Sequence, residues 1–455
     1  MIPEKFLQRM QTMLSPAEYE AFVDALARPA VRALRVNTVK TTPEALLPLL
    51  PFAGEALPFS SIAFFAGEDK VGAHPAHHAG MFYMQDPSAV SAVSALTDLT
   101  GIRALDLCAA PGGKSTALGA AIGESGVLVS NEYVSARCRI LQGNVERMGL
   151  TNTIITNKDT ADLADFYGPV FDLVVADAPC SGEGMLRKYE VAGEEWSEEN
   201  VALCATRQRE ILTNAARCVA EGGRLLYATC TFSVEENEQN VAWFLDTHPD
   251  FTLIPVANAV AASTADGISV GGHNLTLCRR YYPHKAPGEG QFLALFRRVD
   301  GDAAKLPRQD GLQPLTKAET DTITAFLADV LENIPAGRLG RLRDTVYLAP
   351  ALSVPTSGVF TAGIALGSIT KGRVEPHHQF FSALGNTFKR KLCLKDGDTR
   401  VAAYLRGEEI DATELASAKN GFAALLYEGA PLGGGKLVSG RLKNHYPKGL
   451  RNHNG

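Results

Sequence analysis

The segment IRALDLCAAPGGKST (residues 102–116) carries the strongest indication of the fold. Its apolar first half, residues 102–109, has the character of a buried strand and leads through a glycine turn into a helical stretch. In open parallel sheets such a turn binds ligands, because glycines let the backbone approach and the helix amides point outward. The segment therefore predicts a ligand-binding loop at the carboxyl end of a parallel strand.

Further apolar runs follow at the spacing of a parallel sheet with crossover helices. They lie at residues 126–132, 152–157, 171–178 and 223–230, and a late run at 291–299 can close the sheet. Helix signals lie between them: a helix from Ser135 to Gly149, a long helix capped by Ser197 that stops at Gly222–Gly223, and a Ser233–Glu236 capping box. We expect an α/β domain over residues 76–300.

The rest of the chain divides by composition. Residues 1–75 predict a small accessory domain, with helix over 3–28, an alternating strand ALRVNTVK and a proline-rich loop. Residues 300–312 are polar with proline and glycine and predict a linker. Beyond them Thr316 and Glu319 can cap a helix, and RDTVYLA is strand-like. We divide this part into residues 301–385 and 386–455.

Composition restricts the class of protein. With 455 residues, 45% apolar and 21% charged, the chain fits a globular protein of about three domains. It has neither an apolar run long enough for a membrane helix nor an export signal at its start. The eight cysteines include no CxxC pair, so we expect no metal and no disulfide framework, but free thiols in the cytoplasm.

Charge is unevenly distributed along the chain. The net charge is −6, yet residues 28–40, 388–395 and 436–455 are locally basic. Such runs fit a phosphate-binding surface built from separate pieces, and they fit solvated charged faces equally well.

Three cofactor classes compete for the glycine loop. A phosphate-binding P-loop needs glycine where the chain has Cys108, and a dinucleotide loop needs more than the adjacent pair Gly112–Gly113. A nucleoside cofactor without a pyrophosphate remains, and S-adenosylmethionine is the obvious member. Glu132, at the end of the next strand, can accept the ribose hydroxyls, and Asp159 follows the third strand toward the adenine end.

Two cysteines follow two neighbouring strands, in DAPCSG (177–182) and TCTFS (229–233). A thiolate that adds to carbon 6 of cytosine makes carbon 5 nucleophilic, so a cysteine beside a methyl donor indicates covalent catalysis. Asp177 can hydrogen-bond the polar edge of the base and, if protonated, stabilise the addition. The residues alone do not decide whether Cys180 or Cys230 is the nucleophile.

The segments LDLCAAPGGKST, DAPCSGEGMLRK and YATCTFSVEENEQNV, with QDPSAV at 85–90, resemble the Nol/Nop/Sun-type RNA cytosine-5 methyltransferases. The tail GRLKNHYPKGLR (440–451) is similar to the C-terminal region of bacterial ribosomal RNA members of the RsmF type. The resemblance implies a Rossmann-like class I methyltransferase domain between a small N-terminal domain and a PUA-like RNA-binding region.

The resemblance also implies roles at matching positions. Cys108, Ala109, Ala110, Pro111, Gly112, Gly113 and Lys114 would line the cofactor site with Glu132, Asp159 and Asp177. Cys230 would be the nucleophile and Cys180 would assist product release. Arg187 and Lys188 either contact RNA or are an exposed basic pair.

We therefore expect a cytoplasmic enzyme that methylates carbon 5 of cytosine in RNA, with small-subunit (16S) ribosomal RNA or the subunit itself as partner. Transfer RNA is the alternative substrate. A non-catalytic RNA-binding or ribosome assembly factor, which would have lost a thiol or the cofactor acids, is the alternative of another class, and a protein or small-molecule methyltransferase is a third.

Overall fold

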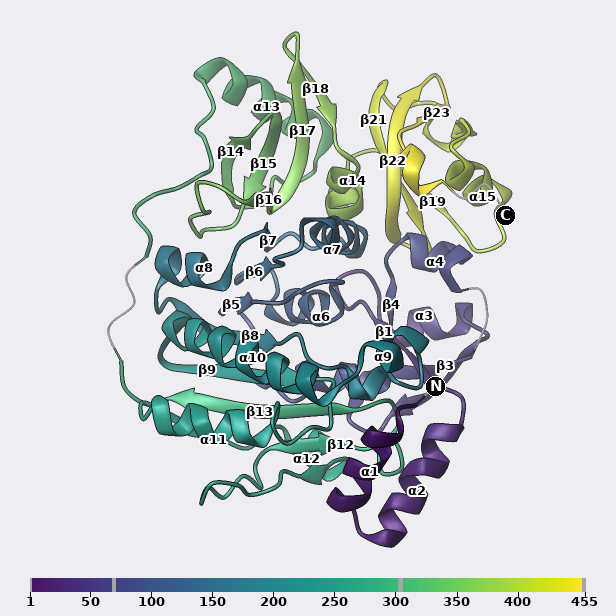
Figure 1. The fold of residues 1–455 in the computed structure, drawn as a ribbon. Helices are drawn as coiled ribbons and strands as arrows, with labels where there is room; N and C mark the ends of the chain where they lie inside the picture. The colour runs from purple at the N-terminus through teal and green to yellow at the C-terminus, as the bar shows by residue number, and fades with distance from the viewer. Residues whose placement is uncertain (1, 68–70, 302–305, 452–455) are drawn as a thin grey trace.

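The computed structural model describes residues 2–67, 71–301 and 306–451. Figure 1 shows a broad central sheet with helices on its faces, two smaller β-containing lobes from the C-terminal part above it, and the N-terminal helices below and to the right. Of the predicted linker, residues 302–305 lie outside the described residues.

Ten strands of the described chain form the central sheet, in the order β11-β12-β13-β9-β8-β5-β6-β7-β16, with β10 beside β13. The predicted strands are confirmed as β5 (Arg103–Asp106), β6 (Val127–Asn131), β7 (Thr153–Thr156), β8 (Phe171–Asp177), β9 (Val219–Thr229) and β13 (Gln291–Arg298). The first five pair in parallel and β13 is antiparallel to β9. The short strands are β10 (Phe251–Leu253), β11 (Ala265–Asp266), β12 (Arg279–Tyr281) and β16 (Val359–Ala362).

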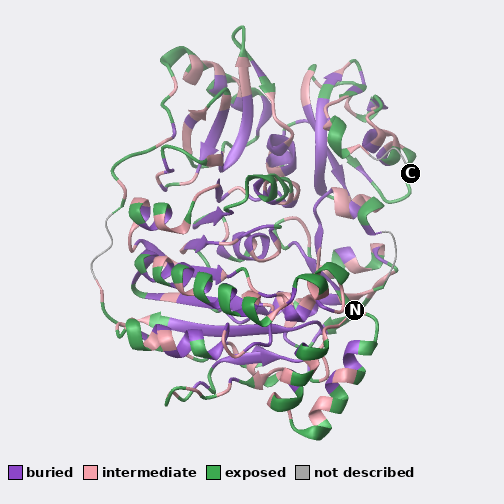
Figure 2. Cartoon of the chain, viewed as in Figure 1, coloured by how far each residue is buried: buried purple, intermediate pink, exposed green. Residues whose placement is uncertain are grey.

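Helices cover both faces of this sheet, so its strands are buried on both sides (Figure 2). They are α5 (Pro87–Ser94), α6 (Gly113–Ile122), α7 (Ser135–Met148), α8 (Thr160–Tyr167), α9 (Glu190–Glu195), α10 (Glu198–Cys218), α11 (Glu238–Thr247) and α12 (Asn258–Ala262). The predicted Rossmann-like architecture is confirmed.

Some of the predicted helix ends and caps are confirmed, and others are wrong. Gly149 ends α7 with a φ of 71°, and Ser197 caps α10 by accepting the Asn200 N–H, both as expected. The helix α10 ends at Cys218, not at Gly222–Gly223, because β9 already begins at Val219. The Ser233–Glu236 capping box is wrong: α11 begins at Glu238, and both side chains are used elsewhere.

The N-terminal part has two longer helices, two short ones and a four-stranded antiparallel sheet. The longer helices are α1 (Glu4–Met13) and α2 (Pro16–Ala27), which together confirm the helical prediction for 3–28. The sheet has the order β2-β3-β1-β4, from Ala53–Leu57, Ser60–Ala66, Arg32–Val36 and Phe82–Gln85. The short helices α3 (Pro43–Leu46) and α4 (Pro75–His78) connect these strands. The predicted proline-rich loop therefore contains β2 and β3.

The C-terminal part forms two sheets. The first, β14-β15-β17-β18, comprises Arg338–Leu342, Thr345–Ala349, Ile364–Thr370 and Arg373–Pro376 and packs with α13 (Lys317–Val330) and α14 (His378–Leu384). The predicted Thr316–Glu319 capping box is present. The second, β19-β21-β22-β23-β20, comprises Lys391–Leu394, Gly421–Tyr427, Ala430–Val438, Arg441–Asn444 and Ile410–Asp411, with α15 (Thr399–Arg406).

Candidate active site and cofactor pocket

A pocket of about 530 Å³ opens at the carboxyl ends of the parallel strands. Cys108, Glu132 and Asp159, which were predicted from three separate strand ends, all line it. Its other wall is formed by Pro179 and by residues of α10 that include Arg207 and Asn214. Small-molecule sites commonly measure about 300–1,000 Å³, so the pocket has room for a nucleoside cofactor.

The glycine loop leads directly into α6, and hydrogen bonds from neighbouring elements hold its backbone in place. The Ala109 N–H donates to the Asn131 carbonyl at 2.8 Å, and the Ala110 carbonyl accepts from Arg137 at 2.7 Å. Gly112 has a φ of 114°, in the region that favours glycine. Pro111 is exposed, and its carbonyl accepts from Asn144 at 2.8 Å. Gly113 is the first residue of α6.

The two predicted cofactor acids differ in setting. The side chain of Glu132 is 5% exposed, accepts the Val134 N–H at 2.8 Å and lies 3.4 Å from Arg137. Asp159 is exposed and accepts the Ala161 N–H at 2.8 Å as the cap of α8. Both carboxylates line the pocket and can accept further hydrogen bonds, which suits ribose hydroxyls at Glu132 and the exocyclic amino group of adenine at Asp159.

Lys114 and Asp177 form an ion pair beside the pocket, with Nζ 2.7 Å from Oδ2. Burial opposes the charge of Lys114, but attraction to Asp177 outweighs it and raises the pKa of the ammonium. Behind this pair lies Asp106, fully buried and accepting from Ser115 at 2.6 Å. Burial raises the pKa of Asp106 to about 7.

The two predicted thiols are in contact. Cys180 follows β8, Cys230 follows β9, and their Sγ atoms are 3.2 Å apart. The Cys230 N–H donates to Cys180 Sγ at 3.4 Å. The hydrogen bond to Cys230, together with burial, raises the pKa of Cys180 well above its usual range. The sulfur contact and this backbone hydrogen bond hold the two thiols side by side.

The expectation that Arg187 and Lys188 form an exposed basic pair is wrong, whereas their contact with RNA stays a prediction. The side chain of Arg187 is 8% exposed and donates to Glu289 at 2.8 Å, and that of Lys188 is 19% exposed and lies 2.5 Å from Asp86. Arg187 also donates to the Ala25 carbonyl at 2.7 Å. These cations join the loop after Cys180 to the N-terminal helices and to the QDPSAV segment.

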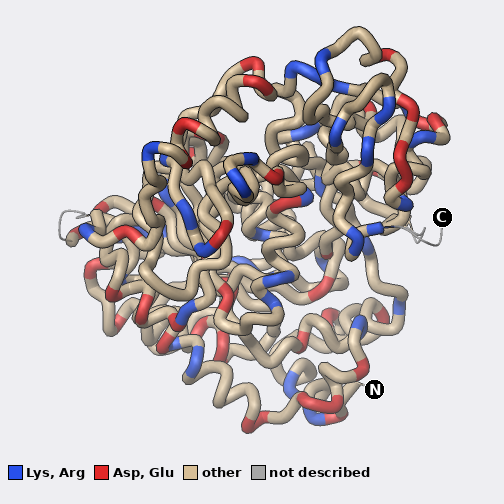
Figure 3. Tube along the Cα trace, turned by 90° about the horizontal axis from the view of Figure 1, so that it is seen from above, with Lys and Arg blue, Asp and Glu red and all other residues tan. Residues whose placement is uncertain are grey.

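Many cations of the predicted basic runs make hydrogen bonds or ion pairs within the protein. Arg35 is 4% exposed and donates to Thr116, and Arg390 is 7% exposed and pairs with Asp329. In the last run, by contrast, Lys436 and Lys443 are exposed and face each other across β22 and β23. Figure 3, seen from above, shows cations and acids interspersed along the chain.

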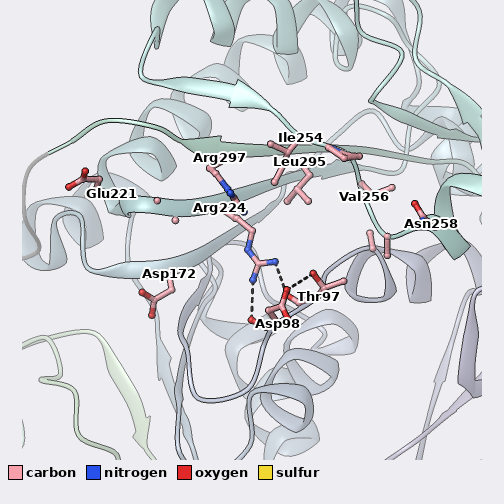
Figure 4. A pocket seen from close by; sticks show the side chains of 15 residues that line it. Thr97, Asp98, Asp172, Glu221, Arg224, Ile254, Val256, Asn258, Leu295 and Arg297 are labelled. Carbon is pink, nitrogen blue, oxygen red and sulfur yellow. Dashed lines mark hydrogen bonds between the residues drawn. The ribbon is translucent and has the colours of Figure 1, made fainter.

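A second pocket, of about 800 Å³, lies at the opposite end of the sheet (Figure 4). Arg224 and Arg297 face each other across β9 and β13 there, and Arg224 donates to the carbonyls of Thr97 and Asp98. None of the predicted site residues lines this pocket. It is therefore separate from the thiols.

The polar groups that hold the thiol loops, above all Glu183, were not predicted from the sequence. The position of Glu183, three residues after Cys180, was the one available indication. No helix in the described ranges is long and apolar enough to cross a membrane. Within those ranges, no cluster of three His, Cys, Asp or Glu side chains is arranged to hold a metal ion.

Three family models match the chain. They are 16S rRNA methyltransferase RsmB/F over residues 94–297, the N-terminal domain of 16S rRNA methyltransferase RsmF over 2–87, and the methyltransferase RsmF PUA domain over 391–452. The ribosomal RNA small subunit methyltransferase F of Vibrio campbellii is 32% identical, over 99% of this chain and 97% of its own. That of Erwinia tasmaniensis is 29% identical, over 98% and 96%.

Solved structures agree on the fold. A methyltransferase homologue from Pyrococcus horikoshii has a TM-score of 0.55 at 24% identity, over 65% of this chain and 100% of its own. NSun6 from the same organism, solved with SFG, has a TM-score of 0.55 at 20% identity, over 66% and 99%. The predicted enzyme class and the cofactor S-adenosylmethionine are confirmed. The chain belongs to the RsmF family of 16S ribosomal RNA methyltransferases.

Proposed function

We propose that this chain methylates carbon 5 of cytosine in small-subunit ribosomal RNA, with Cys230 as the nucleophile. The observation that carries the proposal is the contact of two thiols, 3.2 Å apart, at the strand ends that adjoin the cofactor pocket. Methyl transfer to an amino group needs no such thiol, whereas carbon 5 of cytosine must first be activated.

The protein groups divide the work by position. We assign the addition to carbon 6 of the base to Cys230, because this is the role that the resemblance to the RNA cytosine-5 methyltransferases implies for the cysteine of the TCTFS segment. The Asp177 side chain can accept a hydrogen bond from the exocyclic amino group of cytosine, and Lys114, whose Nζ lies 2.7 Å from Asp177 Oδ2, holds that side chain in place. S-adenosylmethionine supplies the electrophilic methyl group. Cys180 then assists the release of the methylated base.

Cofactor binding is assigned to the pocket of Cys108, Glu132 and Asp159. The loop from Ala109 to Gly113 borders it, since the loop backbone is tied to Asn131 and Arg137 on the pocket wall. The base must leave any stack to reach the thiols, which favours a loop or flipped-out cytosine.

The substrate is inferred from the relatives, whose names specify the small ribosomal subunit. Bacterial ribosomal RNA is transcribed in the cytoplasm, so the proposal places the enzyme there. A non-catalytic assembly factor is disfavoured because both thiols and both cofactor acids are present.

Bisulfite mapping tests the substrate. Ribosomal and transfer RNA from cells with and without the gene are compared, and the gene is restored with Cys230 intact or changed to Ala. We expect at least one 16S cytosine to lose its methyl mark without the gene or with Cys230→Ala. Loss of marks in transfer RNA alone would transfer the proposal to that substrate, and unchanged marks in both would refute it.

A further inference from the structure

Two carboxylates lie buried directly behind the thiol pair. Glu183 and Glu236 are 2% and 0% exposed. Their hydrogen-bond partners within the described ranges are all uncharged N–H or O–H donors. A buried carboxylate is costly unless its oxygens are well satisfied. The presence of two such carboxylates beside one pair of thiols therefore indicates that they have a function there.

Glu183 belongs to the Cys180 loop but binds the Cys230 loop. Its Oε2 accepts from the Thr231 hydroxyl at 2.9 Å and from the Phe232 N–H at 3.0 Å. Its Oε1 accepts from the Ser233 hydroxyl at 2.7 Å and from Trp196 Nε1 at 3.0 Å. Three consecutive residues after Cys230 are thus held by one carboxylate from the neighbouring loop.

Glu236 makes the reverse connection. It follows Cys230 in the chain, and its carboxylate accepts from the Ser181 N–H at 2.9 Å, from the Ser181 hydroxyl, and from Gln208 at 2.8 Å. The Ser181 and Thr231 hydroxyls are themselves 3.0 Å apart. Each cysteine is therefore adjacent to a residue bound by a carboxylate from the other cysteine's loop.

We propose that Glu183 and Glu236 are positioning residues: a reciprocal carboxylate brace that locks the two loops together and fixes the contact between Cys180 and Cys230. The Gly184 N–H, which donates to the Cys230 carbonyl at 2.8 Å, adds a backbone link at the same place. Neither carboxylate lines the cofactor pocket. Its consequence for turnover rests on the proposed function, but its geometric effect on the thiols does not.

The hydrogen-bond partners of Glu183 and Glu236 predict different effects when each residue is replaced by glutamine. Both oxygens of Glu183 accept backbone or indole N–H groups, so either orientation of Gln places an NH₂ against an N–H donor. At Glu236 one oxygen accepts only the Ser181 hydroxyl, which can turn to accept from an NH₂ group. Glu183→Gln should therefore open the brace, whereas Glu236→Gln should keep it and Glu236→Ala should not.

The test is the rate at which Cys180 and Cys230 form a disulfide in the full-length protein. Diamide, an azo oxidant, takes two electrons and two protons from the thiols and is reduced to the hydrazine, and mass spectrometry follows the linked peptides. We expect Glu183→Gln and Glu236→Ala to slow the reaction at least about tenfold, since displacements near 1 Å have effects of this size or larger. Glu236→Gln should stay within about twofold of the parent.

Glu235→Gln is the matched control, because Glu235 lies next to Glu236 but pairs with Arg9 outside the brace. It should form the disulfide at the parental rate. Methylation should show reduced kcat with unchanged KM for S-adenosylmethionine in Glu183→Gln and Glu236→Ala alone. Should Glu183→Gln fail to fold, Ser233→Ala removes one of its contacts and must slow the disulfide measurably.

Parental disulfide rates in folded Glu183→Gln and Glu236→Ala would overturn the brace, as would equal slowing in Glu235→Gln. A parent chain that methylates no RNA, while its brace variants still slow the disulfide, would refute the proposed function and leave the brace intact.

Discussion

At the scale of single residues, the pocket-lining side chains were predicted correctly from their positions at the ends of strands. Cys108, Glu132 and Asp159 line one pocket because carboxyl ends of parallel strands meet at one edge of a sheet. Arg187 and Lys188 could not be predicted in the same way. Their partners Glu289 and Asp86 are about a hundred residues distant in sequence, so only the fold brings them together.

Glu132 should contribute directly to cofactor affinity. Glu132→Ala removes the acceptor that we assign to the ribose and should weaken S-adenosylmethionine binding by roughly 1.5–3 kcal/mol, the range for hydrogen bonds to a charged group. Isothermal calorimetry measures this, with RNA affinity as the control that should barely change. Equal cofactor affinity in variant and parent would remove Glu132 from the site.

Asp106 should make the stability of the protein depend on pH. Because its pKa is raised to about 7, the folded chain keeps a proton that an unfolded aspartate releases near pH 4. The stabilisation from this proton is complete below about pH 4 and is lost as the pH rises to about 7. Relative to Asp106→Asn, the parent should lose on the order of 2–4 kcal/mol of unfolding free energy over that range. Denaturant titrations that show a pH-independent difference would contradict this.

At the scale of elements, the sequence predicted the strands of the sheet well, because strands that are buried on both faces have near-continuous apolar sequences. It failed where side chains find tertiary partners. The Ser233–Glu236 pair has the spacing of a capping box, yet both side chains serve the thiol loops. The strand β16 was also missed, because it joins β7 from 200 residues further along the chain, and its pairing depends on the C-terminal fold.

The strands β22 and β23 give the clearest RNA-binding candidate among the basic runs. Lys436 and Lys443 are exposed and directly opposite each other, an arrangement that is destabilising unless an anion lies nearby. Changing both to Gln should make the log–log salt dependence of RNA binding shallower by about 0.7–0.9 per lost phosphate contact. Filter binding at several salt concentrations measures this. Lys395→Gln, which removes a lysine paired with Glu428, is the control, and an unchanged slope in the double variant would exclude these lysines from the interface.

At the scale of the whole molecule, one lysine joins three parts of the chain. Lys40 Nζ donates to the carbonyls of Ala79 at 2.8 Å, Arg147 at 3.0 Å and Pro431 at 3.0 Å. These belong to the N-terminal part, to α7 and to β22. The sequence showed Lys40 only as one cation of a basic run, and the domain limits at residues 75, 300 and 385 remain predictions.

Lys40→Met keeps an unbranched side chain that is one atom shorter, and it leaves three carbonyls without their donor. We expect it to lower the free energy of unfolding by about 1.5–3 kcal/mol. Lys395→Met, at a lysine whose side chain is 81% exposed, should change it by less than about 0.5 kcal/mol. Chemical denaturation measures both, and equal stability of the two variants would mean that Lys40 does not hold the parts together.

We propose that Cys230 attacks the base and that Cys180 assists its release. The most direct measurement is denaturing gel electrophoresis of Cys180→Ala and Cys230→Ala after incubation with substrate RNA and S-adenosylmethionine. Cys180→Ala should still add and methylate but then stall, so a slow-migrating adduct that disappears on RNase digestion is expected for it alone. Cys230→Ala should bind cofactor, form no adduct and transfer no methyl group. An adduct in Cys230→Ala and none in Cys180→Ala would exchange the two roles, and parental methylation rates in both variants would contradict covalent catalysis by this pair.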